Sequence, residues 1–118
     1  MKKSFIALSM LIIIFQLVVA APPQLFNTSL TVTVRDETGN TVAGAFVKLF
    51  ENEESYNQEK NAVAEGTADA KGVFRFKKLK PIAYFILVKK DDKDNSGGGE
   101  KIGKLEEGKF NKVTVVIQ

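Results

Sequence analysis

The residue types that usually perform catalysis are scarce in this sequence. It contains no histidine and no cysteine, so the usual general base and the usual soft nucleophile are both missing. The serines beyond the N-terminal segment, Ser29, Ser55 and Ser96, lack the Gly-x-Ser-x-Gly context of an activated nucleophile. Adjacent carboxylates occur only in polar stretches, where water keeps both members ionised. We therefore expect a protein that is not an enzyme and that needs no cofactor.

The stretch Asp-Lys-Asp-Asn-Ser-Gly at residues 92–97 matches the first half of a calcium-binding loop. In such loops, oxygen atoms at alternate positions surround the cation and a glycine makes the sharp bend. The match ends there, because Gly103 stands where a bidentate glutamate is required. We expect a solvated loop between two strands, and we commit to no metal site. Calcium binding by Asp92, Asp94 and Ser96 remains the alternative.

Two aromatic residues are candidates for a partner contact. In residues 45–50 apolar side chains alternate, which assigns Ala45, Val47 and Leu49 to the core. Phe46, Lys48 and Phe50 then occupy the opposite face, where neighbouring exposed aromatics often mark a binding surface. The alternative, which we favour, is that the polar segment 51–62 folds back over this face, with Tyr56 packing nearby.

Basic residues gather in the second half of the chain. They are Arg75, Lys77, Lys78, Lys80, Lys89 and Lys90. Such a group could attract anionic glycans or lipid headgroups. Lysines at sheet edges also prevent strands from pairing with other molecules, and we favour this protective role.

The elements that carry these residues are strands. Residues 30–35, 45–50, 63–68, 73–77, 82–90 and 112–118 alternate or are continuously apolar, as expected of strands. Turn-forming residues separate them at 36–44 and 69–72, and the second turn predicts a hairpin between its flanking strands. The segment 51–62 is polar, with one helical turn expected at residues 53–58, and residues 91–100 are expected to form a loop. We expect an all-β protein, a single seven-stranded Greek-key β-sandwich.

The first twenty residues resemble an export signal. Lys2 and Lys3 precede a largely apolar run from residue 5 to residue 19, and small residues precede a cleavage point after Ala20. We predict a signal peptide at 1–20, a lead-in at 21–27 and the β-sandwich domain at 28–118. The alternative is an uncleaved anchor, although the run is shorter than the roughly 20 residues that span a bilayer.

The charge of the exported part argues against nucleic acid as a partner. The whole chain has a formal net charge of +3, but removing Lys2 and Lys3 leaves 15 basic and 14 acidic residues, a net charge of +1. A nucleic-acid-binding surface needs a dense basic stripe, which a nearly neutral domain does not favour. We expect no nucleic-acid partner and no stable membrane insertion after cleavage, and we leave the oligomeric state open.

Two sequence blocks resemble a known domain family. Residues 34–49 carry V-x-D-x-x-G-x-x-V-x-G-A-x-V-x-L, and residues 66–81 carry G-T-x-D-x-x-G-x-F-x-F-x-x-L-x-P. Together they resemble the carboxypeptidase regulatory-like domains, relatives of collagen-adhesin B-type repeats and transthyretin-like sandwiches. The resemblance implies a stand-alone secreted bacterial member with that fold, and it is nearly silent on function.

Two chemistries of such families find little support in this sequence. The hydroxyisourate hydrolases use histidines, which this chain lacks. Some adhesin-type domains join a lysine on an early strand to an asparagine near the last strand. Asn111 fits the second position, but the first strand offers only Arg35, and Lys48 points away from the expected core.

These observations predict a non-catalytic binding or scaffolding module of the cell envelope, exported to the periplasm or the cell exterior. Its expected partner is an envelope protein or an extracellular polymer, met through Phe46 and Phe50 or through the variable loops. The alternative function is a carbohydrate- or calcium-dependent adhesion module.

Overall fold

The computed structural model describes residues 27–118 and is almost entirely β-structure. The predicted signal peptide and most of the lead-in lie outside the described residues. The elements are β1 (Ser29–Asp36), β2 (Phe46–Phe50), α2 (Glu53–Gln58), β3 (Ala64–Thr67), β4 (Val73–Phe76), β5 (Tyr84–Lys90), β6 (Lys93–Asp94), β7 (Lys101–Ile102) and β8 (Phe110–Ile117). No helix within residues 27–118 is long and apolar enough to cross a membrane.

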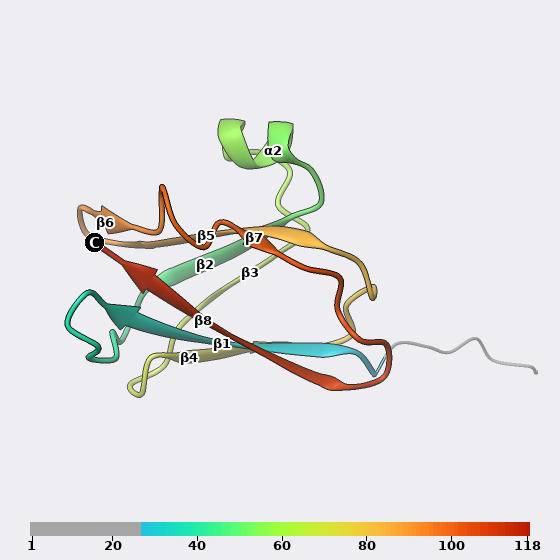
Figure 1. Cartoon of the computed structure of the whole chain (residues 1–118), viewed down its shortest axis with the longest axis horizontal. Helices are drawn as coiled ribbons and strands as arrows, with labels where there is room; N and C mark the ends of the chain where they lie inside the picture. The colour runs from blue at the N-terminus through green and yellow to red at the C-terminus, as the bar shows by residue number, and fades with distance from the viewer. Residues whose placement is uncertain (1–26) are drawn as a thin grey trace, which may run out of the picture.

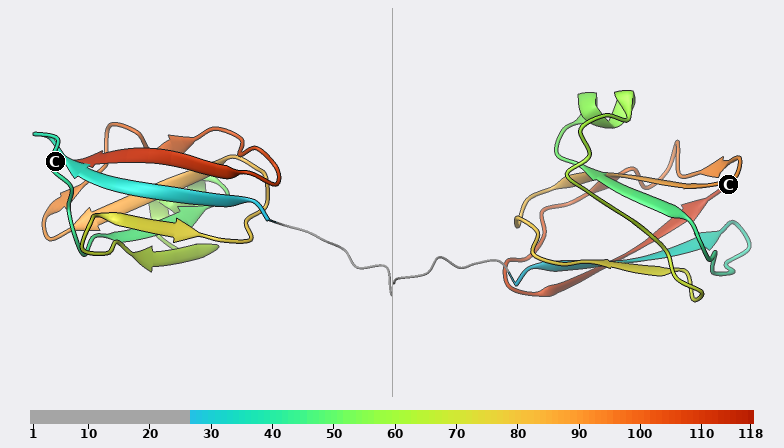
Figure 2. Two further views of the ribbon diagram at one scale, coloured as in Figure 1. Left: turned by 90° about the horizontal axis from the view of Figure 1, so that it is seen from below. Right: turned by 180° about the vertical axis from the view of Figure 1, so that it is seen from behind.

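The strands form two sheets that face each other (Figure 1). The first sheet has the order β4-β1-β8, and its β1–β8 pair is parallel. The second sheet has the order β3-β2-β5-β6, with β7 also pairing with β5. The two views of Figure 2 show the layers from below and from behind, with α2 standing on the outer side of the second sheet. The predicted β-sandwich is confirmed, although the described residues contain eight strands rather than seven.

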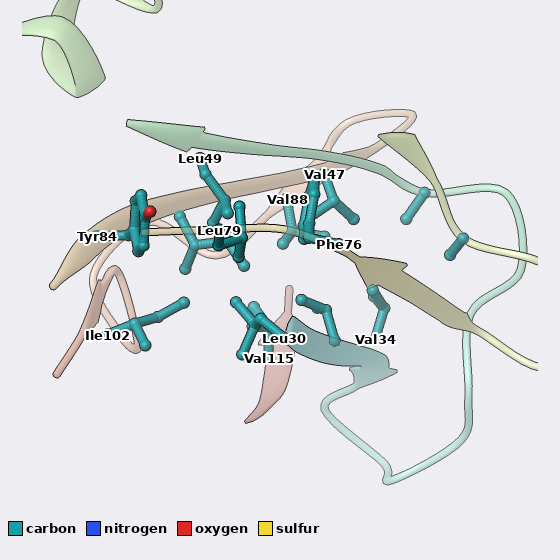
Figure 3. Packing of buried hydrophobic residues seen from close by; sticks show 14 of the residues in the cluster. Leu30, Val34, Val47, Leu49, Phe76, Leu79, Tyr84, Val88, Ile102 and Val115 are labelled. Atoms are coloured by element: carbon teal, nitrogen blue, oxygen red, sulfur yellow. The ribbon is translucent and has the colours of Figure 1, made fainter. Parts of the chain in front are cut away.

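The core lies between the sheets and follows from the alternation in the sequence. Leu30, Val32 and Val34 of β1 are at most 1% exposed, and Val47 and Leu49 of β2 are fully buried. Figure 3 shows Leu30, Val34, Val47 and Leu49 in the space between the sheets, together with Val88 of β5 and Val115 of β8. Burial of apolar side chains from both inner faces is what holds two such sheets together.

The connection between β1 and β2 is ordered by its own side chains. The Asp36 carboxylate accepts hydrogen bonds from the backbone N–H groups of Thr38 and Asn40, both at 3.0 Å. Gly39 has a φ of 92° and Gly44 a φ of 78°, values that side-chain-bearing residues rarely adopt. Because β1 and β2 belong to different sheets, this turn carries the chain from one layer of the sandwich to the other.

The hairpin predicted between residues 63–68 and residues 73–77 is wrong. Although the turn at 69–72 is present, β3 pairs with β2 and β4 pairs with β1, so the turn joins the two sheets. The Phe74 ring of β4 lies against the backbone of Gly66 on β3. The inward Phe74 and Phe76 rings, with centroids 4.8 Å apart, therefore fill the space between the layers, and β3 and β4 face each other across it.

The predicted loop at 91–100 is also only partly right, because it contains β6. Lys93 and Asp94 pair with the end of β5, and β7 pairs with its beginning. Between these two short strands, the Asn95 side chain hydrogen-bonds to the backbone of β5, accepting from Val88 N at 3.0 Å and donating to Ile86 O at 2.8 Å. The Asn95 side chain thus supplies hydrogen bonds to the edge of β5 between β6 and β7, where no strand pairs with it.

Candidate functional site

The outer face of the second sheet carries the predicted contact residues. The pairing register places Phe46 between Thr67 of β3 and Lys89 of β5, and it places Lys48 between Glu65 and Leu87. Phe50 lies next to Phe85 at the far end of the same face. The three predicted residues therefore share one surface, as the alternation required.

Phe50 is not available to a partner, and its assignment as a contact residue is wrong. It is fully buried, in a small cluster with Tyr56 of α2 and Leu87 of β5. The Tyr56 ring meets Phe50 edge-on, with centroids 5.8 Å apart and an interplanar angle of 84°. The alternative in which segment 51–62 covers this face is therefore correct for Phe50.

The covering helix is positioned by its two ends. The Asn52 side chain accepts a hydrogen bond from Ser55 N at 2.8 Å, and Glu53 and Glu54 occupy the first turn, where the helix dipole favours acids. Glu59 ends the helix with a φ of 54°, and its carboxylate receives the Lys89 ammonium group at 2.9 Å. This ion pair connects the end of α2 to the sheet beside Phe46.

Phe46 remains open and borders a surface hollow. Its side chain is 62% exposed. The hollow measures about 370 Å³ and is lined by Phe46, Lys48, Glu59, Glu65, Leu87 and Lys89. The exposed ring can stack against a ligand, while the neighbouring side chains of both charges hydrogen-bond to the polar groups of that ligand.

A second, more acidic hollow lies on the other side of the Glu59–Lys89 pair. Its lining includes Tyr56, Glu59, Asp94, Ser96 and Glu100. Burial is the larger cause that raises the pKa of Tyr56 to about 12, and the neighbouring Glu100 carboxylate adds to it. The phenol therefore keeps its proton to a higher pH than an ordinary tyrosine does.

Two residues of the stretch weighed as an alternative calcium loop make structural hydrogen bonds. The Asp94 carboxylate accepts a hydrogen bond from Ser96 N at 2.9 Å, and this bond and that from the Ser96 hydroxyl hold its pKa below the usual range. Asn95, the fourth residue of the stretch, is 1% exposed and bonded to β5. Within residues 27–118, no group of three or more acidic, histidine or cysteine side chains is placed to hold a metal ion.

The other chemistry weighed from the sequence is not assembled either. Asn111 donates from Nδ2 to Ser29 O at 3.1 Å and to Glu106 O at 3.1 Å. Lys48 lies on the outer face of the other sheet, so no lysine–asparagine crosslink between these two residues is placed to form.

The sequence did not indicate the roles of two further residues, Asn95 and Phe110. The only signal for Phe110 was an aromatic residue just before the last predicted strand.

Comparison with known proteins identifies the fold and no family. No family model matches the chain, and no curated protein matches it. The backbone protein of group B streptococcus pilus 2b aligns with a TM-score of 0.55 and 18% identity, over 77% of this chain and 40% of that one. The D312A variant of the major pilin subunit of Bacillus cereus aligns with a TM-score of 0.51 and 17% identity, over 79% and 30%.

This chain thus spans well under half the length of the pilin proteins it matches. At these identities the similarity establishes a shared β-sandwich fold. A hydroxyquinol 1,2-dioxygenase from Pseudomonas putida aligns at 9% identity, over 75% of this chain and 55% of that one, with a TM-score of 0.49, which is too low to support a statement about activity.

Proposed function

We propose that the chain is a non-catalytic binding module of the cell envelope, exported to the periplasm or cell exterior, that meets its partner around Phe46. The observation that carries this proposal is the 62% exposed Phe46 ring at the lip of a hollow bearing Lys48 and Lys89 together with Glu59 and Glu65. Phe50 is instead buried against Tyr56 of α2. The partner is an envelope protein or an extracellular polymer.

The electrostatics of the acids support a non-catalytic role. A general acid near neutral pH needs a carboxyl group whose pKa is raised by burial or by a like charge. Hydrogen bonds from neighbouring groups lower the pKa of Asp36, Asp69 and Asp94. These carboxylates organise turns, which is a structural use.

The fold supports the scaffolding part of the proposal. The two pilin proteins that share it are named as a pilus backbone protein and a major pilin subunit. A sandwich without a catalytic constellation in its described part suits a comparable building or adhesion role. The resemblance of residues 34–49 and 66–81 to carboxypeptidase regulatory-like domains, which also occur as appended modules, points the same way.

An adhesion module that binds carbohydrate is the second candidate, and the same exposed ring favours it. Aromatic rings often stack against the apolar face of a ligand ring while nearby charged groups bind its polar atoms. The calcium-dependent form of this candidate has less support, because residues 27–118 contain no group of three or more side chains placed to hold a metal ion.

The test immobilises the purified protein and exposes it to an envelope extract of the source organism. Phe46→Ser removes the proposed contact, and Val116→Ser is a control that removes an exposed apolar side chain from the other sheet, away from the Phe46 hollow. We expect one component to be retained by the wild type and by Val116→Ser and to be lost with Phe46→Ser. Equal retention by all three proteins would contradict the proposal, and retention of glycan alone would favour the second candidate.

A further inference from the structure

A third hollow lies on the outer face of the first sheet, remote from Phe46. It measures about 390 Å³ and is lined by Asn27, Ser29, Arg75, Lys77, Lys78, Gly108 and Phe110. Its residues come from the start of β1, the end of β4 and the start of β8, which the sheet order brings side by side. Three of them are cationic, and none is acidic.

Ser29, which lines this hollow, has a buried hydroxyl without a hydrogen-bond partner in the described chain. Ser29 is only 3% exposed, and its Oγ atom makes no hydrogen bond within the described chain. Buried polar side chains nearly always have a partner, so an exception calls for an explanation. The Oγ atom has almost no exposed surface, so the Ser29 side chain or one that covers it must move before the hydroxyl can donate its proton to a bound oxyanion.

The charge around Ser29 is uncompensated. The ion pairs found in residues 27–118 are Lys80–Glu51 and Lys89–Glu59, so Arg75, Lys77 and Lys78 have no carboxylate within salt-bridge distance there. The first 26 residues contain no aspartate or glutamate that could neutralise them. Lys78 also adopts a φ of 57°, an unfavourable conformation for a residue with a side chain. Strained residues of this kind are often found at binding sites.

Phe110 gives the hollow an apolar wall. Its side chain is 70% exposed, and the Arg75 guanidinium carbon lies 4.6 Å from the ring centroid. This cation–π contact holds the guanidinium group at the hollow. An oxyanion and an apolar ring surface could therefore be bound together.

We propose that this hollow binds an acidic saccharide. Its carboxylate or sulfate would accept hydrogen bonds from Ser29 Oγ and Arg75, with Lys77 and Lys78 supplying further charge, while the sugar ring packs on Phe110. A lipid surface is disfavoured because basic clusters that bind anionic membranes usually hold about four to eight Lys or Arg residues. The site is separate from the one at Phe46, and it assigns a ligand to basic residues otherwise explained as edge protection.

The experiment measures binding of three short oligosaccharides by calorimetry: a polygalacturonate fragment, a heparin fragment and a neutral dextran fragment. We expect one or both acidic probes to bind, with an affinity that falls as salt is added, and the dextran fragment not to bind. Ser29→Ala should weaken binding about tenfold, since one hydrogen bond to a charged group is lost, while leaving the melting temperature unchanged. Arg75→Gln should weaken it further.

Two controls make the test specific. Lys71→Gln removes one positive charge at the opposite end of β4, from an exposed turn residue, and should bind like the wild type. Phe46→Ser should also bind like the wild type, so this proposal and the one for Phe46 fail separately.

Several outcomes would overturn the proposal. An equal loss in Lys71→Gln and Arg75→Gln would show nonspecific charge attraction. A lower melting temperature in Ser29→Ala would indicate a structural hydroxyl. Inorganic sulfate that binds as tightly as the heparin fragment would leave no role for the sugar. Tighter binding of phosphatidylglycerol vesicles than of either saccharide, insensitive to Ser29→Ala, would identify a lipid surface.

Discussion

The Phe74 ring on β4 packs against the backbone of Gly66 on β3, so closely that a Cβ atom at position 66 would overlap the ring. The two residues come from different sheets and approach each other across the sandwich. The packing contact therefore requires a glycine at position 66. The backbone conformation does not require it, since any residue can adopt that conformation.

The first prediction follows from this contact. Gly66→Ala should lower the free energy of unfolding by about 1–3 kcal/mol, because the Phe74 ring must shift in a packed core. Urea unfolding measures the change. Gly98→Ala is the control, since nothing lies within 4 Å of that position, and it should have little effect. The explanation fails if Gly66→Ala is equally destabilising in a Phe74→Leu background.

The second prediction concerns Asn95, whose side chain bonds to Val88 N and Ile86 O of β5. Asn95→Ala leaves both buried backbone groups unpaired and should cost about 2–4 kcal/mol of stability. Thermal unfolding monitored by circular dichroism measures this effect. Asn57→Ala on exposed α2 is the matched control and should be nearly neutral. An unchanged melting temperature in Asn95→Ala would show that β5 is satisfied in another way.

The third prediction is a loss of stability in alkali. The pKa of Tyr56 is raised to about 12, whereas a tyrosine in an unfolded chain titrates near 10. The folded state thus holds the phenol proton more tightly, so this contribution is complete below about pH 10 and is lost as the pH rises toward 12. Tyr56→Phe should show a shallower decline over this range in urea titrations. An identical decline in both proteins would contradict the assignment.

The fourth prediction is a loss of stability in acid. The Asp69 carboxylate accepts hydrogen bonds from Val73 N and Lys71 N, and these hold its pKa below the usual value. Its contribution is therefore present above about pH 4 and is lost as the pH falls through the lowered pKa. Asp69→Asn keeps an accepting oxygen that does not titrate, so its stability should depend less on pH in this range. Asp92→Asn, changed in the same way at an exposed site, should behave like the wild type.

The fifth prediction concerns metal removal. With no suitable group of side chains in residues 27–118, the melting temperature in millimolar calcium should equal that in EDTA. Differential scanning calorimetry makes the comparison. A calcium-dependent rise that disappears in Asp94→Ala would restore the calcium loop.

Strand positions were predictable because alternating apolar residues report which face is buried. This worked for Leu30, Val32 and Val34 and for the inward half of β2. The turn at 69–72 did not reveal its partners, since the same turn residues suit a hairpin and a crossing between sheets. The signal that distinguishes them is Gly66 opposite Phe74, which only the packed structure brings together.

The candidate site was predictable in part for a similar reason. Alternation assigns Phe46 and Phe50 to one face, but it contains no information about which of them α2 covers. That depends on Tyr56 reaching over Phe50, a contact between separate elements. From the sequence Asn95 is only a loop residue, because the gap it fills between β6 and β7 exists only in the assembled sheet.

The parallel pairing of β1 with β8 has a mechanical consequence. Ser29 pairs with Phe110 and Asp36 with Ile117, so the chain enters the domain at one end of this ladder and reaches Gln118 at the other, as Figure 1 shows. A pulling force applied between these two ends acts along the strands and loads their hydrogen bonds together, in shear. Bonds loaded in this way must break nearly at once, whereas a hairpin pulled at its open end unzips one bond at a time. The domain is therefore built to resist tension along its length.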